Sequence, residues 1–370
     1  MNHASFEKKR GKPRILVAPL DWGLGHATRV IPIIRELHEL GADVWVAGEG
    51  AQEQLLKTEF PGIPFLPLKG YRVRYAATAW GLFRQLVVQS PGLLRAIKRE
   101  HTWLKHAIQE YQLDAVISDN RYGLYSAAIP CIFITHQLQI KSLLGKWGEG
   151  LLQKSNYRYI QRFTECWVPD YEGEGLAGEL SHPRKLPAIP VRYLGMLSRF
   201  ESKLTGDIKG NLLFMLSGPE PQRTILENAI VTQVAHYPGH AVIVRGLPGE
   251  PRIIPSTNMI RFYNHLPTAD LQEVIAHAEY IICRSGYSTV MDLAALQKKS
   301  IMIPTPGQTE QEYLGTYLQQ KKFTVCIAQK DFSLNKALQQ AAHFNYIFPK
   351  AGGAEFKMTI AEFFNAFHRR

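Results

Sequence analysis

Short apolar runs alternate with amphipathic segments along most of the 370-residue chain. The first run, residues 14–20, ends in a glycine-rich turn, after which apolar residues recur at helical spacing as far as Gly41. Nine later runs also predict strands, at residues 42–47, 115–118, 131–135, 212–216, 241–245, 259–262, 280–283, 300–303 and 324–327. Strands that alternate with helices are typical of open parallel sheets with helices on both faces.

The alternation lapses once and then restarts. Residues 186–200 contain two prolines and a glycine, and a new strand begins at residue 212. This pattern predicts an α/β fold with two Rossmann-like, doubly wound parallel-sheet domains that face a central cleft, at residues 1–199 and 200–350. The last periodic segment, 354–367, has no strand after it. We expect the stretch 351–370 to form a helix that packs across the domain junction.

Basic residues are concentrated in one part of a chain whose formal net charge is +11. The segment 69–106 carries eight Lys and Arg residues but only one acid, Glu100, and it also contains many large apolar residues. This mixture suits an anionic membrane surface. The alternative is an ordinary basic helix packed on the core. No recognisable nucleic-acid-binding module accompanies the charge, so nucleic acid is not an expected partner.

No apolar run reaches the roughly 20 residues that a membrane-spanning helix needs, and the first residues are polar and basic. We therefore expect a cytoplasmic protein, associated at most peripherally with the inner face of the cytoplasmic membrane.

The loop after the first strand is a candidate catalytic segment. Gly23 and Gly25 permit a tight turn, and His26 follows at the expected carboxyl end of the strand, where ligands bind in such sheets. An imidazole there is suited to take a proton from an acceptor hydroxyl, so His26 is the candidate general base. The alternative is that His26 only caps the helix or braces the loop.

Two further strand ends supply candidate partners. Asp119 ends a later strand, where a carboxylate would orient the imidazole, although an Asx-turn or helix cap is the alternative. His136 follows the strand at 131–135 and is a candidate for the acceptor side. A dinucleotide site is another interpretation of the first loop, with Glu49 as its ribose-binding acid, although Thr28 replaces the third glycine of that fingerprint.

A second loop, residues 284–289, joins a strand to a helix and is a candidate diphosphate site. Small residues and hydroxyls open the helix N-terminus, where backbone N–H groups and the helix dipole favour anions. Asp292 lies one to two turns into this helix, within reach of ribose hydroxyls. The alternative is a simple helix start. The candidate residues are Arg284, Ser285, Gly286, Thr289 and Asp292.

The turn after the next strand, residues 304–311, offers the amides of Gln308 and Gln311 and the carboxylate of Glu310 to the same cleft. Neutral amides donate and accept hydrogen bonds, which suits the hydroxyls of a sugar.

Together these motifs resemble the GT-B glycosyltransferases, and most of all the MurG-like branch with its glycosyltransferase family 28-type C-terminal domain. Residues 285–292 resemble the SGxxTxxE donor motif of that family, with Asp292 in place of the glutamate that holds ribose. Gln308 and Gln311 resemble the glutamines that bind donor-sugar hydroxyls, which are adjacent in the family.

The resemblance assigns further donor contacts. It implies that Arg199, in GMLSR, meets the donor phosphate, and that Ser217 and Gly218 form a turn beside it. Tyr263 and Asn264 stand where the backbone of the family contacts uracil.

The expected activity is an inverting, metal-independent transfer of a hexose or N-acetylhexosamine from a UDP-sugar, with UDP-N-acetylglucosamine as the first candidate. The acceptor would be a hydroxyl of an unidentified molecule, for which lipid-linked and cell-envelope compounds are candidates. No cofactor is expected. The alternatives are a UDP-N-acetylglucosamine 2-epimerase-type enzyme and a non-catalytic sugar-nucleotide-binding protein.

Overall fold

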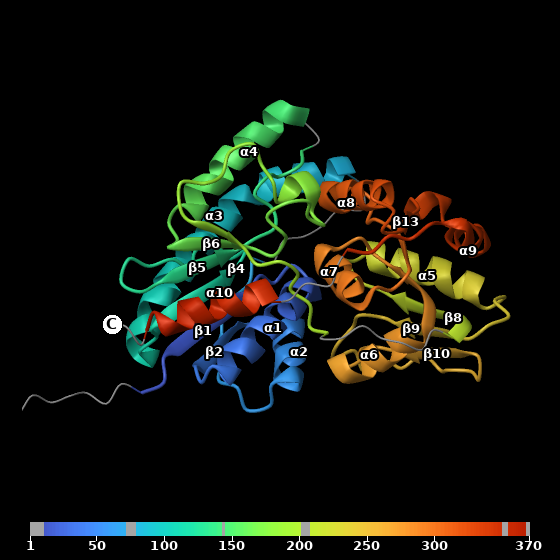
Figure 1. Cartoon of the computed structure of the whole chain (residues 1–370), viewed down its shortest axis with the longest axis horizontal. Helices are drawn as coiled ribbons and strands as arrows, with labels where there is room; N and C mark the ends of the chain where they lie inside the picture. Colours follow the sequence, from blue (N-terminus) through green and yellow to red (C-terminus); the bar gives the residue numbers. More distant parts are fainter. Residues whose placement is uncertain (1–10, 72–78, 143–144, 201–207, 350–353, 368–370) are drawn as a thin grey trace, which may run out of the picture.

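Two parallel sheets with flanking helices make up the computed structural model, which describes residues 11–71, 79–142, 145–200, 208–349 and 354–367. Figure 1 shows them side by side, the first built from the blue-to-green part of the chain and the second from the yellow-to-orange part.

The N-terminal sheet contains seven strands, and every neighbouring pair is parallel. In spatial order they are β3 (Phe65–Pro67), β2 (Asp43–Gly48), β1 (Arg14–Pro19), β4 (Ala115–Asp119), β5 (Cys131–Ile134), β6 (Glu165–Val168) and β7 (Val191–Tyr193). The helices of this half are α1 (Leu24–Glu39), α2 (Ala51–Glu59), α3 (Ala79–Tyr111) and α4 (Gly145–Ile160), with a 3₁₀ turn at Gly178–Leu180.

The C-terminal sheet has six parallel strands. Their spatial order is β10 (Ile260–Tyr263), β9 (Ala241–Val244), β8 (Ile208–Met215), β11 (Ala278–Cys283), β12 (Ser300–Met302) and β13 (Val325–Cys326). Its helices are α5 (Gln222–Val234), α6 (Thr268–His277), α7 (Tyr287–Leu296), α8 (Thr309–Gln320) and α9 (Leu334–His343), with a 3₁₀ turn at Gln329–Asp331. The predicted two-sheet α/β architecture is confirmed.

The strand order reverses at the centre of each sheet, between β1 and β4 and between β8 and β11. Ligands bind at such switch points, outside the carboxyl ends of the strands. The register of the N-terminal sheet determines which loops lie together at its switch point. Pro19 lies beside Asp119, which in turn lies beside Ile134, so the loops after β1, β4 and β5 begin at one level.

The two halves share one apolar core. A single cluster of buried residues extends from α1, through Ala27 and Val30, to α7, through Val290 and Leu293. The two halves also approach each other closely at Gly25 and Ser288. An ideal Cβ built on Gly25 would stand 3.1 Å from Ser288 Oγ, so a larger residue at position 25 would press against the start of α7.

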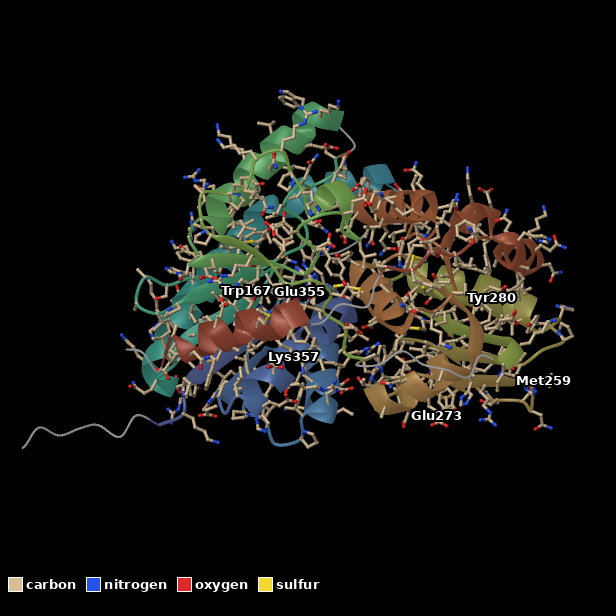
Figure 2. The ribbon with its side chains drawn as sticks, viewed as in Figure 1. Trp167, Met259, Glu273, Tyr280, Glu355 and Lys357 are labelled. Atoms are coloured by element: carbon tan, nitrogen blue, oxygen red, sulfur yellow. The ribbon has the colours of Figure 1, made fainter. Side chains whose placement is uncertain are left out.

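The last helix, α10 (Ala354–Asn365), returns to the N-terminal half. It packs on α1 and β7, and Figure 1 shows it in red across that half of the molecule. The Phe363 ring meets Trp167 edge-to-face at 5.4 Å between centroids, and Ile360 is fully buried. Figure 2 labels Trp167, Glu355 and Lys357 in this region; the Lys357 ammonium lies 3.4 Å from the Glu36 carboxylate of α1. The C-terminal segment thus ties the second half of the chain to the first.

All ten predicted strands are present, and three short strands, β3, β6 and β7, add to them. β7 lies inside the proline-containing stretch that had been interpreted as a break. Its three residues are all half-buried, as expected for an edge strand with weak patterning. The domain limits at residues 199 and 350 stay predictions; the described strands of the two sheets lie on either side of the first.

Candidate active site

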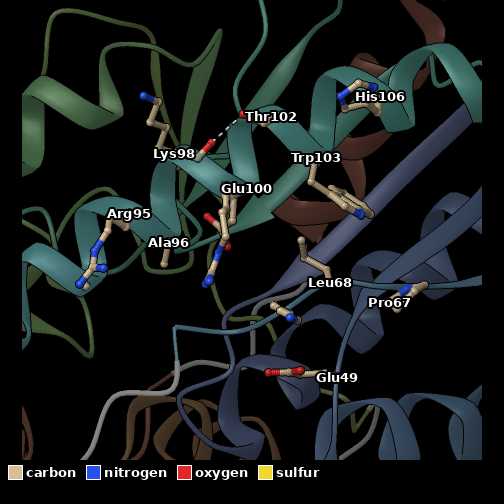
Figure 3. Close-up of a pocket in the computed structure, with 13 residues that line it drawn as sticks. Glu49, Pro67, Leu68, Arg95, Ala96, Lys98, Glu100, Thr102, Trp103 and His106 are labelled. Carbon is tan, nitrogen blue, oxygen red and sulfur yellow. Dashed lines mark hydrogen bonds between the residues drawn. The ribbon is translucent and has the colours of Figure 1, made fainter.

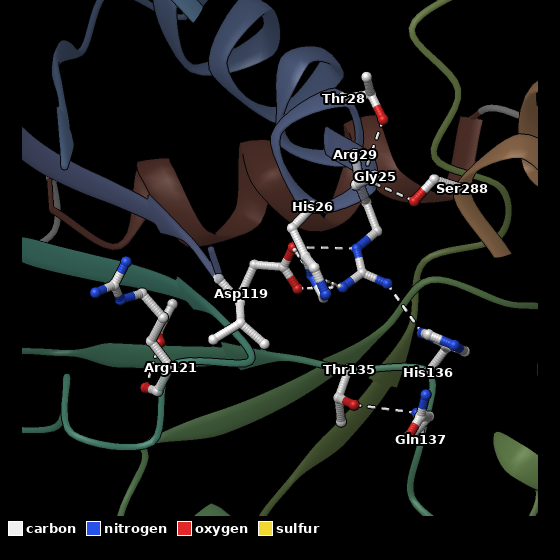
Figure 4. A network of polar contacts seen from close by, with 12 residues as sticks. Gly25, His26, Thr28, Arg29, Asp119, Arg121, Thr135, His136, Gln137 and Ser288 are labelled. Carbon is white, nitrogen blue, oxygen red and sulfur yellow. Dashed lines mark hydrogen bonds and ion pairs between the residues drawn. The ribbon is translucent and has the colours of Figure 1, made fainter. Parts of the chain in front are cut away.

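His26 and Asp119 meet at the switch point of the N-terminal sheet. The imidazole Nδ1 lies 2.9 Å from Asp119 Oδ2, and Figure 4 shows the two side chains converging from α1 and β4. Asp119 is completely buried, whereas 17 % of the His26 side chain is exposed. Gly23, with φ of 95°, makes the turn that starts α1 and so places His26 on its first turn. The structure therefore brings the predicted base and its carboxylate into hydrogen-bond contact.

Arg29 binds the same carboxylate and was not among the predicted site residues. It lies one turn after His26, is 2 % exposed, and its guanidinium contacts both oxygens of Asp119. Burial alone would raise the pKa of Asp119, but the charges and hydrogen bonds of Arg29 and His26 outweigh it and hold that pKa below its usual range. Asp119 is thus an anion at neutral pH. The sequence did offer a signal for Arg29, because a residue three positions after His26 on a helix lies on the same face as His26.

The contact with Asp119 fits one tautomer of His26. Asp119 Oδ2 only accepts hydrogen bonds, so a proton on Nδ1 completes this contact, while Arg29 Nη2, which also donates, lies 3.0 Å from the same nitrogen. The other ring nitrogen, Nε2, then has a free lone pair. It forms no hydrogen bond within the part of the chain that the structure describes. A base directed at a substrate hydroxyl needs this arrangement.

His136 continues the polar network into the C-terminal half. Its Nδ1 accepts from Arg29 Nη1 at 2.9 Å, and its Nε2 donates to Glu310 Oε1 at 2.7 Å. Gln137 donates to the second oxygen of Glu310, and the His136 ring stacks on Tyr287 with 4.3 Å between centroids. Burial lowers the pKa of His136, with Glu310 opposing, so this ring is neutral. Glu310, on α8, is the carboxylate that the sequence placed in this cleft without assigning it a role.

The predicted diphosphate loop is built as a helix start. Gly286 is the N-cap of α7, and Ser285 Oγ donates to the Gln311 carbonyl at 2.8 Å. Thr289 lies half-buried in the first turn of the helix. Ser288 Oγ donates to the Gly25 carbonyl at 2.7 Å, which links this loop to the loop that carries His26.

Arg284 is completely buried beneath this loop. Its guanidinium donates to the carbonyls of Ile303, Pro304 and Gln222, and burial lowers its pKa to about 10. Its Nε has no partner among the described residues, and neither has the buried Thr305 Oγ1. An ideal Cβ on Gly218 would lie within 4.0 Å of both atoms, so these two buried donors flank the turn of Ser217 and Gly218.

Gln308 and Gln311 come together despite their spacing in sequence. Gln311 Nε2 donates to Gln308 Oε1 at 2.5 Å, while Gln311 Oε1 accepts from the Thr305 backbone at 2.9 Å. One turn of α8 thus presents the paired amides that the sequence predicted.

Asp292 and Arg199 contact each other across the junction between the halves. Arg199 Nε lies 3.2 Å from Asp292 Oδ2, and Ser198 donates to Oδ1 at 2.8 Å. Burial raises the pKa of Asp292, against the opposing charge of Arg199. The residues expected to bind ribose and phosphate are therefore neighbours.

Tyr263 and Asn264 stand at the carboxyl end of β10. The Asn264 side chain accepts from Arg245 and donates to the carbonyls of Glu250 and Arg252, so it holds the loop after β9. Its backbone carbonyl accepts from Leu247.

A large basic cavity lies in the N-terminal half, between α3 and the loop after β3 (Figure 3). Its volume is about 1120 Å³, and its basic lining residues are Lys69, Arg95, Lys98, Arg99 and His106. Glu49, the ribose acid of the dinucleotide interpretation, lines it too and accepts from the Gly70 backbone. Of the other basic residues predicted in this segment, Arg72 and Arg74 lie outside the described residues, as does the side chain of Arg84.

Neither a metal cluster nor a membrane span is found among the residues that the structure describes. No three His, Cys, Asp or Glu side chains there are grouped to hold a metal ion. None of the helices there is both long and apolar enough to cross a bilayer.

Comparison with known proteins identifies the class. Residues 256–362 match the glycosyltransferase family 28 C-terminal domain. A relative from Haemophilus ducreyi, named UDP-N-acetylglucosamine--N-acetylmuramyl-(pentapeptide) pyrophosphoryl-undecaprenol N-acetylglucosamine transferase, is 23% identical over 334 residues, which cover 85% of each chain.

Solved structures agree on the fold. The glycotransferase of kitacinnamycin superposes with a TM-score of 0.60 at 14% identity, covering 97% of this chain and 95% of its own. MurG of Acinetobacter baumannii superposes with a TM-score of 0.51 at 14% identity, again covering 97% of this chain and 95% of its own. The chain is thus a nucleotide-sugar-dependent glycosyltransferase with the GT-B fold. Within that class it is MurG-like.

Proposed function

We propose that this enzyme transfers a hexose or N-acetylhexosamine, with N-acetylglucosamine the first candidate, from a UDP-sugar to a hydroxyl of a lipid-linked acceptor, with inversion and without a metal ion. The observation that carries the proposal is the His26–Asp119 pair, one hydrogen bond from the donor-side loop through the Gly25–Ser288 contact.

The reaction is a single displacement. His26 Nε2 removes the proton of the acceptor hydroxyl, and the oxygen attacks the anomeric carbon of the donor sugar. The bond from that carbon to the diphosphate oxygen breaks, and the electron pair leaves on UDP. One displacement inverts the anomeric centre. Asp119 stabilises the imidazolium that forms, as a buried carboxylate hydrogen-bonded to Nδ1 does in other base–orienter pairs.

Negative charge develops on the diphosphate as it leaves, and positive groups nearby would stabilise it. The N-terminus of α7 at Gly286 supplies backbone N–H groups and the positive end of the helix dipole. Arg199 and the buried donors beside Gly218 lie at the same edge of the C-terminal sheet. Preorganised dipoles and a guanidinium stabilise such charge without a metal. We therefore expect chelators to leave the rate unchanged.

A lipid-linked acceptor is supported by the name of the H. ducreyi relative, which specifies an undecaprenol-linked substrate. The basic cavity beside the loop after β3 supports a role at the inner face of the cytoplasmic membrane, because exposed Lys98 and Arg99 are suited to anionic headgroups.

The test is a transfer assay with UDP-N-acetylglucosamine and a polyprenyl-diphosphate-linked sugar acceptor. His26→Ala should lower kcat by about 10²- to 10⁴-fold, the usual contribution of a general base. His38→Ala is the matched control, since His38 is exposed on the same helix. Equal loss in both variants, or conversion of the UDP-sugar to an isomer without acceptor, would reject the proposal.

A further inference from the structure

The polar network around the base crosses from one half of the molecule to the other. It runs from His26 through Asp119 and Arg29 to His136, and ends at Glu310 on α8. We propose that Arg29 and Glu310 are positioning residues for His26, and that the His136–Glu310 contact makes the alignment of the base depend on closure of the two halves. This inference rests on the proposed function.

Arg29 fixes the carboxylate that orients the base. Its Nε lies 3.3 Å from Asp119 Oδ2, and its Nη2 bonds Oδ1, so the guanidinium fork holds the plane of the carboxylate. The same Nη2 lies 3.0 Å from His26 Nδ1. In the Nδ1–H tautomer of His26, both groups donate to Asp119. Arg29 thus sets the direction in which His26 Nε2 faces.

Glu310 supports the Arg29 guanidinium indirectly, because it binds His136 and His136 binds Arg29 Nη1. His136 Nδ1 accepts from Arg29 only if Nε2 carries the ring proton, and Glu310 Oε1 binds that proton at 2.7 Å. The two imidazoles are therefore opposite tautomers, Nδ1–H in His26 and Nε2–H in His136. Because Glu310 comes from the donor half, this support exists only when the halves are together.

Proton transfer to His26 changes the net charge of the network. With neutral rings, Asp119, Arg29 and Glu310 sum to one negative charge; proton transfer to His26 brings the sum to zero. Burial would raise the pKa of Glu310, but the hydrogen bond from His136 and the charge of Arg29 hold that pKa below its usual range. Tyr287, stacked on His136 from α7, carries no charge because burial raises its pKa further. Glu310 thus takes part in the network as an anion from the other half of the molecule.

The first experiment compares steady-state kinetics of wild type and Glu310→Gln. We expect kcat to fall about tenfold and the donor KM to change less than twofold, because His136 loses its charged partner and Arg29 is then held less firmly against Asp119. Glu273→Gln, an exposed acid on α6 (Figure 2), makes the same charge change away from the network and should match wild type.

Two further variants distinguish positioning from direct donor binding. In a His26→Ala background, Glu310→Gln should have no further effect on the residual rate. A donor KM that rises more than fivefold with kcat unchanged, or an effect that persists without His26, would show that Glu310 binds the donor itself and overturn the inference. Arg29→Lys keeps the charge but loses the fork, and should lower kcat more than Glu310→Gln does.

A readout without turnover separates this inference from the proposed function. Histidine-selective ¹⁵N NMR of wild type should show one Nδ1–H ring for His26 and one Nε2–H ring for His136. Glu310→Gln should shift the His26 signals as well as those of His136. If the His26 signals are unchanged, the inference fails; if they shift but no UDP-sugar is turned over, only the proposed function fails.

Discussion

The His26–Asp119 pair owes its placement to strand register. Asp119 is the last residue of β4 and lies beside Pro19, so its carboxylate stands next to the loop that leads into α1. Because the group is fully buried, its negative charge requires partners, and Arg29 and His26 supply them. The buried charge is thereby kept beside His26, the proposed base.

Asp292 offers the sharpest residue-scale test of donor binding. We expect Asp292→Ala to weaken UDP binding by about 10- to 100-fold, which corresponds to losing a hydrogen bond from a ribose hydroxyl to a charged acceptor. Burial raises the pKa of Asp292, so its carboxylate takes up a proton at a higher pH than an ordinary aspartate. The UDP affinity of the wild type should therefore fall on acidification more steeply than that of the variant. Isothermal titration calorimetry across pH measures both effects.

Glu273→Ala serves as the control for that titration, because Glu273 is an exposed acid in the same half of the molecule. Unchanged or tighter UDP binding by Asp292→Ala would mean that Asp292 serves only to hold Arg199, whose guanidinium it now contacts.

At the residue scale, the sequence predicted single polar residues better than their contacts. His26 and Asp119 were found because each ends or follows an apolar run, and such positions lie at the ligand-binding edge of a parallel sheet. The His136–Glu310 contact joins residues 174 positions apart. No local pattern encodes that pairing, because it depends on how the two sheets pack against each other.

At the scale of elements, the sequence predicted the helix α10 but not the surface on which it packs. Its amphipathic pattern predicted a helix that must dock, and the structure places it on α1 and β7 of the N-terminal half. The apolar stripe specifies that one face is buried but not which surface covers it. The short edge strand β7, which borders that surface, was hidden because Pro187 and Pro190 precede it and its residues are only half-buried.

Ile360→Ala tests the contribution of α10 to stability. Ile360 is fully buried against the N-terminal half, so truncation should cost about 2–5 kcal/mol by lost transfer energy and cavity formation. Met358→Ala on the same helix removes a side chain that is 63% exposed and should change stability by less than about 0.5 kcal/mol. Thermal unfolding followed by circular dichroism compares them. Equal melting temperatures for the two variants would show that α10 does not stabilise the fold through this face.

At the scale of the whole molecule, the two halves differ in what they present to solvent. The N-terminal half carries the basic cavity, and Lys98, Arg99 and Lys105 are exposed on consecutive turns of α3 at or beside it. The C-terminal half has exposed lysines as well, at positions 322, 330 and 336 in and around α9. Neutralising three basic residues beside the cavity can therefore be compared with neutralising three lysines of the C-terminal half, which removes the same charge.

We expect the triple variant Lys98→Gln, Arg99→Gln and Lys105→Gln to lose most of its binding to anionic vesicles. Each basic residue near such a surface contributes about 1 kcal/mol, so three together correspond to a drop of about a hundredfold in partitioning at low salt. Co-sedimentation with vesicles of phosphatidylglycerol and phosphatidylcholine, repeated at rising salt, measures the loss. The triple variant Lys322→Gln, Lys330→Gln and Lys336→Gln removes equal charge from the other half and should retain the wild-type partitioning. If both triple variants lose binding equally, the attraction reflects net charge alone, and the orientation of the cavity toward the membrane is rejected.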